Sequence, residues 1–356
     1  MQIKGVTSTM IFESSALNRD EKIGGNILSI KKYSSADGVY SYIGRPAVRY
    51  SLFQTLQELF NWKEAPLKLS QSSDDNKKKV VQFDFPTANI VSYPEMDVFG
   101  YMITRTGDSS IIRKAPLGIT KAVSLEPWMA DMAFYANHDL INRLRRTGEN
   151  CEPNPYQKEE HYSWYKLSFT IDLTRLGYHE LMVGKMPEDL AAYIESLAPA
   201  EQTDLHLGEH EDLLPEIDQW YAIEDQGYLG VKAMSKAQRI VFVVKEEEKK
   251  RRLRQLLTVM KNGLMYHAST ENYGMIPLFN IIGGLRVPAP LFHGALRMNR
   301  QQLEVEALNH ALRNDYLAHF FVSGPLNNSL ERLEQEKMLD WSGFLCSLTL
   351  AADAKE

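Results

Sequence analysis

Basic side chains lie on both sides of a short turn near the N-terminus, in a pattern that suits anion binding. Lys31 and Lys32 precede the Gly/Ser-rich stretch SSADG, and Arg45 and Arg49 follow it, one helical turn apart. If Arg45 is the N-cap, the helix begins at Pro46, and the first free N–H groups and the dipole of that helix favour an anion. Because a guanidinium can bind a phosphate through two parallel hydrogen bonds, the spacing predicts a cradle for consecutive phosphates.

Aromatic residues are interleaved with these basic residues. Tyr33, Tyr40 and Tyr42 lie between the lysines and the arginines, and aromatic rings are surfaces on which single-stranded bases stack. The alternative is that the tyrosines belong to the core and that the arginines form an ordinary solvated helix end. The spacing alone leaves both interpretations open.

A second basic run, KKRRLR, lies within the helix predicted over residues 245–263. Leu253, Leu256, Leu257 and Met260 form the apolar face of this helix. We therefore expect the basic residues to lie on the opposite, solvated face.

Two weaker patterns bear on metal binding and catalysis. His206 and His210 are spaced i, i+4, and Glu209 is an available general base, but the chain has no HExxH motif. Asp97 and Asp108 lie in a segment rich in predicted hairpins. An exposed loop aspartate can support metal-assisted RNA cleavage, although aspartates that form turns are far commoner. We predict no metal site, no cofactor and no catalytic residue.

Alternating strands and helices must position these residues. Val48, Leu52, Leu56, Leu59 and Phe60 give the segment 45–60 one apolar helical face. Without its insertions, the order of elements resembles the ferredoxin-like, or RRM-like, β-α-β-β-α-β plan, so the predicted fold class is α+β. The predicted strands are 2–12, 26–34, 161–173, 239–244 and 277–288, and the predicted helices are 45–60, 245–263, about 300–318 and about 326–340.

Composition indicates a globular chain with segregated charge. The 356 residues carry a net charge of -6, but residues 151–232 carry -12 and residues 233–298 carry +7. The acidic mean therefore does not exclude a polyanionic partner, because the local field decides binding. The N-terminus does not have the pattern of a signal peptide, and no apolar stretch approaches the ~20 residues of a membrane helix. With only Cys151 and Cys346, far apart, we expect a reduced cytoplasmic protein.

Several short motifs together resemble a known family. SALNRDEKIGGNILSIKKY, followed by YSYIGRPAVRYSL and then by DVFGYM at 97–102, is similar to the DevR-type Cascade backbone subunits of type I CRISPR systems, of an I-B-like kind. The similarity is strong over residues 1–60 and 97–125 and looser in the C-terminal half. The individual motifs are short, so their order in one chain is the specific signal.

The resemblance implies an RRM-like palm with finger and thumb insertions. On this basis, residues 1–60 form the first half of the palm and residues 61–155 a hairpin-rich, finger-like insertion. Residues 156–356 form the second half of the palm, with an acidic thumb-like or subunit-contact insertion around 175–235 and C-terminal helices.

The resemblance also implies RNA-contacting residues. Asn18 and Arg19 match a loop motif of the family, and Arg45 and Arg49 match guide-contacting positions at the start of the first helix. Many relatives carry further basic residues where this chain has Val48 and Leu52, so either those contacts are absent here or the register of the helix contacts is shifted by one residue. The nearby lysines complete the predicted RNA-binding set: Lys22, Lys31 and Lys32.

The function implied by the resemblance is structural. Several copies would stack along a CRISPR guide RNA, present it for pairing with target DNA, and bind other Cascade subunits, without enzymatic activity or contact with a membrane. One alternative is a type III-like backbone subunit that also cleaves target RNA through a loop aspartate. Another is a transcriptional autoregulator, suggested only by the older name of the family.

Overall fold

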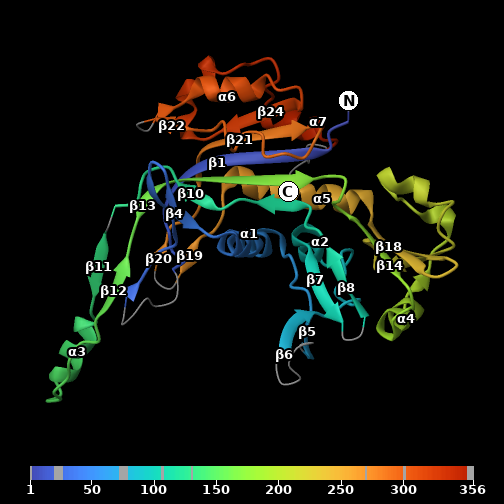
Figure 1. Cartoon of the computed structure of the whole chain (residues 1–356), viewed down its shortest axis with the longest axis horizontal. Coiled ribbons are helices and arrows are strands. Elements are labelled where there is room, and N and C mark those ends of the chain that lie inside the picture. Colours follow the sequence, from blue (N-terminus) through green and yellow to red (C-terminus); the bar gives the residue numbers. More distant parts are fainter. Residues whose placement is uncertain are drawn as a thin grey trace.

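The computed structural model describes residues 2–19, 27–71, 79–105, 108–129, 131–268, 271–299 and 302–350. Long strands and helices alternate, which confirms the predicted α+β class. Figure 1 shows a central sheet with helices above and below it, an arm that extends to one side and a second sheet on the other side.

The central sheet has eight strands, and every strand pair in it is antiparallel. The long strands β1 and β13 are neighbours in the middle, and β21 lies on the other side of β1. The full order is β24-β21-β1-β13-β10-β4-β3, and β9 also pairs with β13. The strands are β1 (Gly5–Ser15), β3 (Lys32–Ser35), β4 (Gly38–Ile43), β9 (Leu117–Ile119), β10 (Ala122–Ser124), β13 (Tyr162–Asp172), β21 (Pro277–Leu285) and β24 (Leu317–Ser323).

Helices cover both faces of the central sheet (Figure 1). Met10 and Phe12 of β1 point to a core shared with α1 (Arg45–Phe60) and α5 (Glu246–Asn262). Ile11 points to the opposite core, which holds α6 (Val305–Leu312). This alternation follows from the two-residue period of a strand.

The second sheet contains five strands and much of the acidic block. Its order is β14-β18-β17-β16-β15, and apolar residues pack on both of its faces. The elements of this region are β14 (Tyr178–Val183), α4 (Glu188–Glu195), β15 (Ala198–Pro199), the 3-10 turns η1 (Gln202–Asp204) and η2 (Gly208–Leu213), β16 (Gln219–Ile223), β17 (Gly227–Ala233) and β18 (Gln238–Val244).

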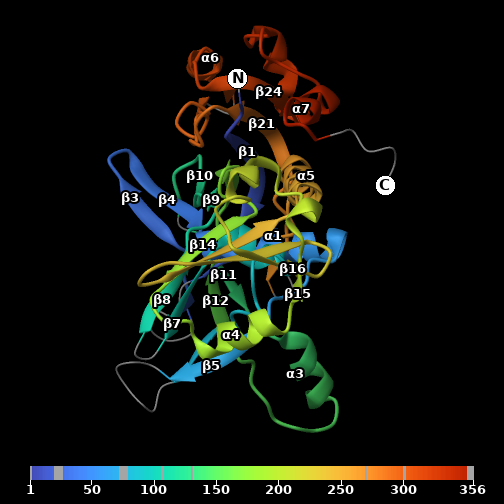
Figure 2. The same cartoon turned by 90° about the vertical axis from the view of Figure 1, so that its right-hand side faces the viewer.

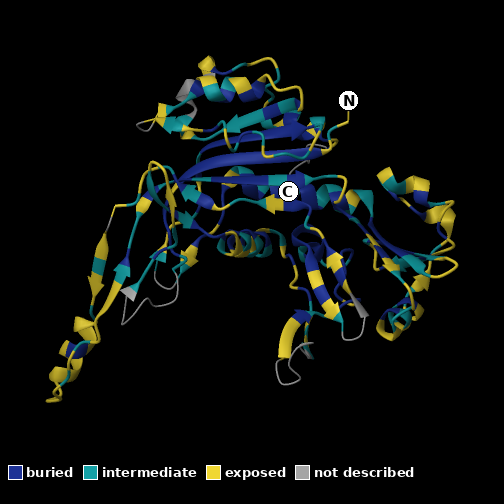
Figure 3. Ribbon diagram, in the orientation of Figure 1, coloured by how far each residue is buried: buried dark blue, intermediate teal, exposed yellow. Residues whose placement is uncertain are grey.

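Two hairpins and an arm project from the body. The arm has α3 at its tip, and Figure 3 shows that most of its surface is exposed. The hairpins are β5 (Leu67–Gln71) with β6 (Lys79–Phe83) and β7 (Tyr101–Arg105) with β8 (Asp108–Arg113), joined by α2 (Pro94–Phe99). The arm consists of β2 (Ile27–Leu28), β11 (Met132–Tyr135), α3 (His138–Arg145) and β12 (Tyr156–Glu159). The remaining short elements are β19 (His267–Ala268), β20 (Glu271–Asn272), β22 (Met298–Asn299), β23 (Gln302–Leu303), η3 (Pro325–Arg332) and α7 (Trp341–Ser347).

One predicted strand lies in a different sheet from the one expected. The segment 239–244 was expected in the palm, but it forms most of β18 in the second sheet. The segment 117–124, expected in the hairpin-rich insertion 61–155, instead supplies β9 and β10 to the central sheet. A run of apolar residues shows that a strand is buried, but it does not show which sheet buries it.

Other element predictions differ mainly in length. The helix predicted over 45–60 is confirmed as α1, although Leu59 is exposed rather than on the apolar face. The helix predicted over about 300–318 is shorter, because α6 has eight residues. The helix predicted over about 326–340 is wrong, because this segment begins as the 3-10 turn η3 and α7 starts only at Trp341.

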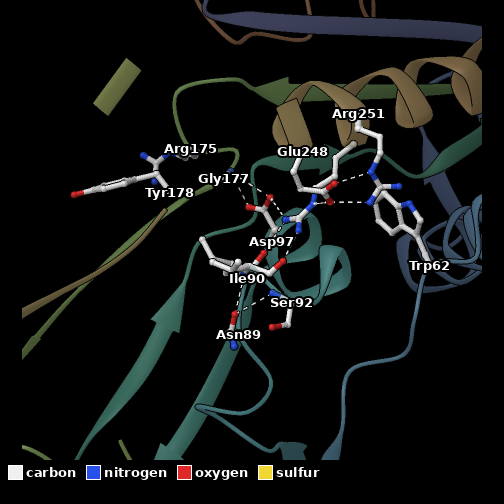
Figure 4. A network of polar contacts seen from close by, with 12 residues as sticks. Trp62, Asn89, Ile90, Ser92, Asp97, Arg175, Gly177, Tyr178, Glu248 and Arg251 are labelled. Atoms are coloured by element: carbon white, nitrogen blue, oxygen red, sulfur yellow. Dashed lines mark hydrogen bonds and ion pairs between the residues drawn. The ribbon is translucent and has the colours of Figure 1, made fainter. Parts of the chain in front are cut away.

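A buried ionic network joins α2, α5 and the segment that leads into the second sheet (Figure 4). Asp97 is fully buried, and its carboxylate accepts hydrogen bonds from Arg113 Nη2 at 2.5 Å, Arg252 Nη1 at 3.0 Å and the Gly177 N–H at 2.9 Å. Arg252 also donates to Glu248 and to two backbone carbonyls. The expectation that the basic run of α5 is solvated is therefore wrong for Arg252, which is fully buried, and for Lys249, which is 7% exposed.

Within the described ranges, no helix is both long and apolar enough to cross a membrane.

Candidate nucleic-acid interface

The N-terminus of α1 opens onto the surface. Gly44, with φ -68° and ψ 150°, is the N-cap, so the helix begins at Arg45, one residue earlier than the sequence suggested. Among the described residues, no side chain caps this end. Arg45 is exposed. The first turn has N–H groups without intrahelical partners, apart from Pro46, which has no N–H, and the exposed Arg45 lies at the same helix end, an arrangement that suits an anion.

A groove with a volume of about 800 Å³ runs beside this helix end. Arg45 and Arg49 both line it, so the structure brings these two predicted residues together. The walls combine aromatic and aliphatic side chains with backbone from β9: Tyr50, Phe53, Phe99, Leu117, Gly118 and Ile119. An apolar wall lowers the local dielectric, which strengthens the attraction of the arginines for an anion.

Arg49 is held only weakly by the protein. Its Nη2 lies 3.5 Å from Glu95 Oε1, its guanidinium lies 4.8 Å from the centroid of the Phe99 ring, and 42% of the side chain is exposed. Burial raises the pKa of the Glu95 carboxyl, although the Ala65 N–H and Arg49 oppose this shift. The long ion pair leaves Arg49 available to a stronger anionic partner.

Asn18 lies against the start of the same helix. A Cβ atom on Gly44 would be 3.2 Å from Asn18 Nδ2. The Asn18 Oδ1 atom is buried and has no hydrogen-bond partner among the described residues. The adjacent Leu17 N–H donates to the Tyr266 hydroxyl at 2.8 Å, which fixes the loop. Asn18 of the loop motif is therefore adjacent to the helix end.

Arg19 is engaged by the protein itself. Its side chain is 10% exposed, and its Nη2 lies 3.3 Å from Glu271 Oε2. Lys158 shares the same carboxylate, with Nζ at 2.5 Å from Oε1. Arg19 thus links the loop to β20, and Lys158 of the arm strand β12 binds the same carboxylate, so the Arg19 side chain is largely withdrawn from solvent.

Lys32 is also paired. Its Nζ lies 2.5 Å from Glu159 Oε1 and 4.0 Å from the centroid of the Trp128 ring. Burial opposes ionisation of Glu159, but hydrogen bonds from Lys32, Ser29 and the Ile30 N–H outweigh it and hold the pKa of Glu159 below its usual range.

Lys31 and Lys22 complete the predicted set. Lys31 is half-buried, and its carbonyl accepts from the Tyr42 N–H at the base of the β3–β4 ribbon. Lys22 lies outside the described residues. The structure therefore brings Asn18, Arg45 and Arg49 together and places Arg19 and Lys32 in ion pairs.

Sequence reasoning missed Lys121. This exposed lysine precedes β10, and its Nζ lies 4.1 Å from the centroid of the Tyr42 ring. The partner of Ile43 in the sheet is Ala122, so Lys121 comes opposite Gly44 at the helix start. Only the strand pairing reveals this proximity, and no motif in the sequence signals it.

The weaker sequence patterns do not form a second site. Asp97 is not an exposed loop residue but the buried centre of the ionic network, so the expectation that it could support cleavage is wrong. Asp108 begins β8. His210 stacks on Tyr178 with ring centroids 4.5 Å apart, and the described ranges contain no cluster of three or more metal-binding side chains.

Comparison with protein families identifies the chain. Residues 6–304 match the family described as CRISPR-associated negative auto-regulator DevR/Csa2. The match covers most of the chain, so the protein belongs to this family, and the predicted membership of the DevR family is confirmed. No curated protein matches the sequence.

Two solved structures align with this chain over nearly its whole length. A chain of a "CRISPR RNA-guided surveillance complex, pre-nicking" has a TM-score of 0.49 and 8% identity, and covers 97% of this chain and 99% of its own length. A chain of a "CRISPR RNA-guided surveillance complex" has a TM-score of 0.48 and 10% identity, with coverage of 97% and 98%.

Proposed function

We propose that this member of the DevR/Csa2 family is a guide-RNA-binding backbone subunit of a type I Cascade complex, and that the groove at the start of α1 holds phosphates of the guide. The observation that carries the proposal is the exposed Arg45 on an open helix N-terminus, beside the weakly paired Arg49. Two guanidiniums and free backbone N–H groups make an arrangement that suits phosphates and does not read bases.

The central sheet is the proposed RRM-like palm. The chain order β1-α1-β9/β10-β13-α5-β21 and the spatial order β21-β1-β13-β10 correspond to the ferredoxin-like plan with antiparallel strands. In this assignment the hairpins within residues 61–155 form the finger-like region. The thumb-like insertion around 175–235 supplies most of the second sheet, which β18 completes. The family motifs then lie at the junction of β1, β4 and α1.

Several copies would assemble along the guide. The arm and the second sheet extend from opposite sides of the palm (Figure 1), which leaves two different surfaces for neighbouring copies and for other Cascade subunits. The acidic second sheet would face away from RNA, because like charges repel. Specificity for target DNA would come from base pairing with the guide, while the protein holds the backbone.

A structural role without catalysis is part of the proposal. The buried position of Asp97 removes one of the two aspartates on which the cleavage alternative depended. The autoregulator alternative requires specific binding of promoter DNA without a guide, and the experiment below separates it from guide binding.

The test is to express the chain with a CRISPR array and its sister subunits, purify the complex in moderate salt and sequence the retained nucleic acid. We expect guide-length RNA with repeat-derived ends. The R45A/R49A variant should retain much less RNA while remaining folded. R313A is the matched control, because Arg313 is 69% exposed and follows α6 on the opposite face of the central sheet.

Random cellular RNA, or none, in a folded complex would contradict the proposed function. Wild-type levels of guide RNA in R45A/R49A would keep the function and reject the site. Retention of a specific promoter fragment in place of RNA would favour the autoregulator alternative.

A further inference from the structure

The β3–β4 ribbon carries three tyrosines on one face, a feature that the phosphate groove does not use. Tyr33 and Tyr40 are cross-strand partners whose rings stack with centroids 5.8 Å apart and planes 24° apart. The Tyr42 ring lies 6.4 Å from that of Tyr33, tilted by 50°. We call Tyr33, Tyr40 and Tyr42 the tyrosine ladder.

The opposite face of the ribbon attaches it to the body. The Ser41 hydroxyl lies 2.8 Å from both His161 Nδ1 and the Tyr165 hydroxyl, and Lys32 pairs with Glu159. Since successive side chains of a strand point to opposite faces, these anchors turn the tyrosine ladder outward. Figure 2 shows the ribbon projecting from the side of the molecule.

The tyrosine ladder is not part of the protein core. None of its members belongs to a hydrophobic cluster of the described ranges, and Tyr33 is 39% exposed. Tyr40 and Tyr42 are half-buried, so each ring of the tyrosine ladder keeps part of its surface in solvent. The arrangement is therefore better explained by a ligand with flat, apolar faces than by folding.

The tyrosine ladder is continuous with the phosphate groove. Lys121 stands over the Tyr42 ring and lies opposite Gly44, where α1 begins. Leu117, Gly118 and Ile119, which precede Lys121 in the chain, line the groove with Arg45 and Arg49. Aromatic and basic groups thus follow one another from the ribbon to the helix end.

We propose that the tyrosine ladder stacks unpaired nucleobases of the same RNA strand whose phosphates occupy the groove, a proposal that rests on the proposed function. Single-stranded RNA offers both an aromatic face and a phosphate at each nucleotide, which matches alternating tyrosines and basic residues. Asp37, which accepts from the Tyr40 hydroxyl at 3.1 Å, lies at the turn of the ribbon. Its charge disfavours phosphates there, so the backbone passes at the Lys121 end.

The experiment measures RNA affinity of the full-length chain by fluorescence anisotropy, with a short oligoadenylate and with an abasic oligomer of equal length. Y33A/Y40A should bind the oligoadenylate at least about fivefold more weakly, since stacking on one aromatic residue contributes at least that much per base. Its salt dependence should not change, because the tyrosines release no counterions. Y33F/Y40F should bind like the wild type, and Y33L/Y40L, which keeps apolar bulk, should bind like the alanine variant.

The abasic oligomer provides the decisive comparison. It keeps the phosphates, so wild type and Y33A/Y40A should bind it equally. Y316A is the control, because Tyr316 is 51% exposed and lies before β24 on the far edge of the central sheet.

Several results would overturn the proposal. The first is equal affinity of the wild type for the two oligomers. The second is an equal loss of affinity for both oligomers in Y33A/Y40A. The third is a change in the oligomeric state of Y33A/Y40A without RNA, which would indicate that the tyrosines bind a protein partner. The same experiment distinguishes an error in the groove assignment from an error in the stacking assignment. If R45A/R49A left affinity for both oligomers unchanged, the groove would be rejected while the base-dependent loss in Y33A/Y40A would still be measured.

Discussion

Two groups of charged residues in this protein differ in how completely the chain itself satisfies them. Around Asp97, two buried arginines donate to one carboxylate at 2.5 to 3.0 Å, and Arg252 also donates to Glu248 and to two backbone carbonyl groups. At the start of α1, Arg45 is exposed and Arg49 has one long contact with Glu95. The first group joins segments of the fold, whereas the second leaves its donors open to a ligand.

The difference follows from the cost of burying charge. A buried ion that loses its partner is strongly unfavourable, so the Asp97 network has to be complete within the chain. An exposed guanidinium remains hydrated and can exchange water for phosphate at little cost. Completeness of pairing therefore separates structural arginines from candidate binding arginines better than position on a helix does.

The largest expected effect comes from breaking the buried group. D97N would remove the counter-charge of Arg113 and would leave Arg252 with Glu248 as its remaining counter-charge, at fully or nearly fully buried positions. We expect the free energy of unfolding to fall by about 3–5 kcal/mol. Urea denaturation followed by circular dichroism measures this change, and a loss under about 1 kcal/mol would show that the network does not hold the segments together.

Removing two charges from the groove should cost much less stability than removing the single charge of Asp97. In R45A/R49A the main loss is the contact between Arg49 and Phe99, so we expect about 1 kcal/mol. The same denaturation experiment applies. A loss as large as that of D97N would make the groove arginines structural and would remove the contrast between the two regions.

Neutralising Glu95, which pairs with Arg49 in the groove, should raise RNA affinity rather than lower it. E95Q keeps an acceptor for the Ala65 N–H but removes a negative charge near the phosphate position, worth roughly 0.6 kcal/mol, so RNA affinity should rise about threefold. Because burial raises the pKa of Glu95, acidification should protonate the carboxyl and strengthen RNA binding by the wild type.

The pH dependence separates this effect from other titrations. E95Q has no carboxyl at position 95, so it should not show the gain in RNA affinity that protonation of Glu95 causes in the wild type. The affinities of the two proteins should therefore converge as the pH falls. Parallel pH profiles for the two proteins would contradict the role given to Glu95.

The smallest effect is expected for an exposed pair on the arm. Asp139 and Arg143 form an i, i+4 pair with side chains 69% and 68% exposed. D139A should lower the free energy of unfolding by at most about 0.5 kcal/mol. A loss above about 1 kcal/mol would show that the exposure of an ion pair does not predict its contribution to the stability of this protein.

Local patterns in the sequence predicted the elements better than their partners. The apolar period identified α1 and α5, and β-branched runs identified β1, β13, β18 and β21. The sheet that contains β18 depends on contacts between distant segments, which no local period encodes. The same reason explains Arg252, whose partners Asp97 and Ile90 lie more than 150 positions away along the chain.

The candidate site was predictable only in part. The helix start and the Asn18 loop could be inferred from short motifs, and the structure places them together. Lys121 could not, because it reaches Gly44 through pairing of β10 with β4. Nor could the sequence show that Arg19 and Lys32 are paired with Glu271 and Glu159, since both acidic residues come from remote strands.

The salt dependence of RNA binding tests the central claim most directly. The dissociation constant of the wild type, R45A/R49A and R313A should be measured for one guide-length RNA across a series of salt concentrations. If the groove holds two phosphates, the slope of log K against log salt should become shallower by about 1.4 in R45A/R49A and remain unchanged in R313A. Identical slopes for all three proteins would contradict the claim that the start of α1 binds the RNA backbone.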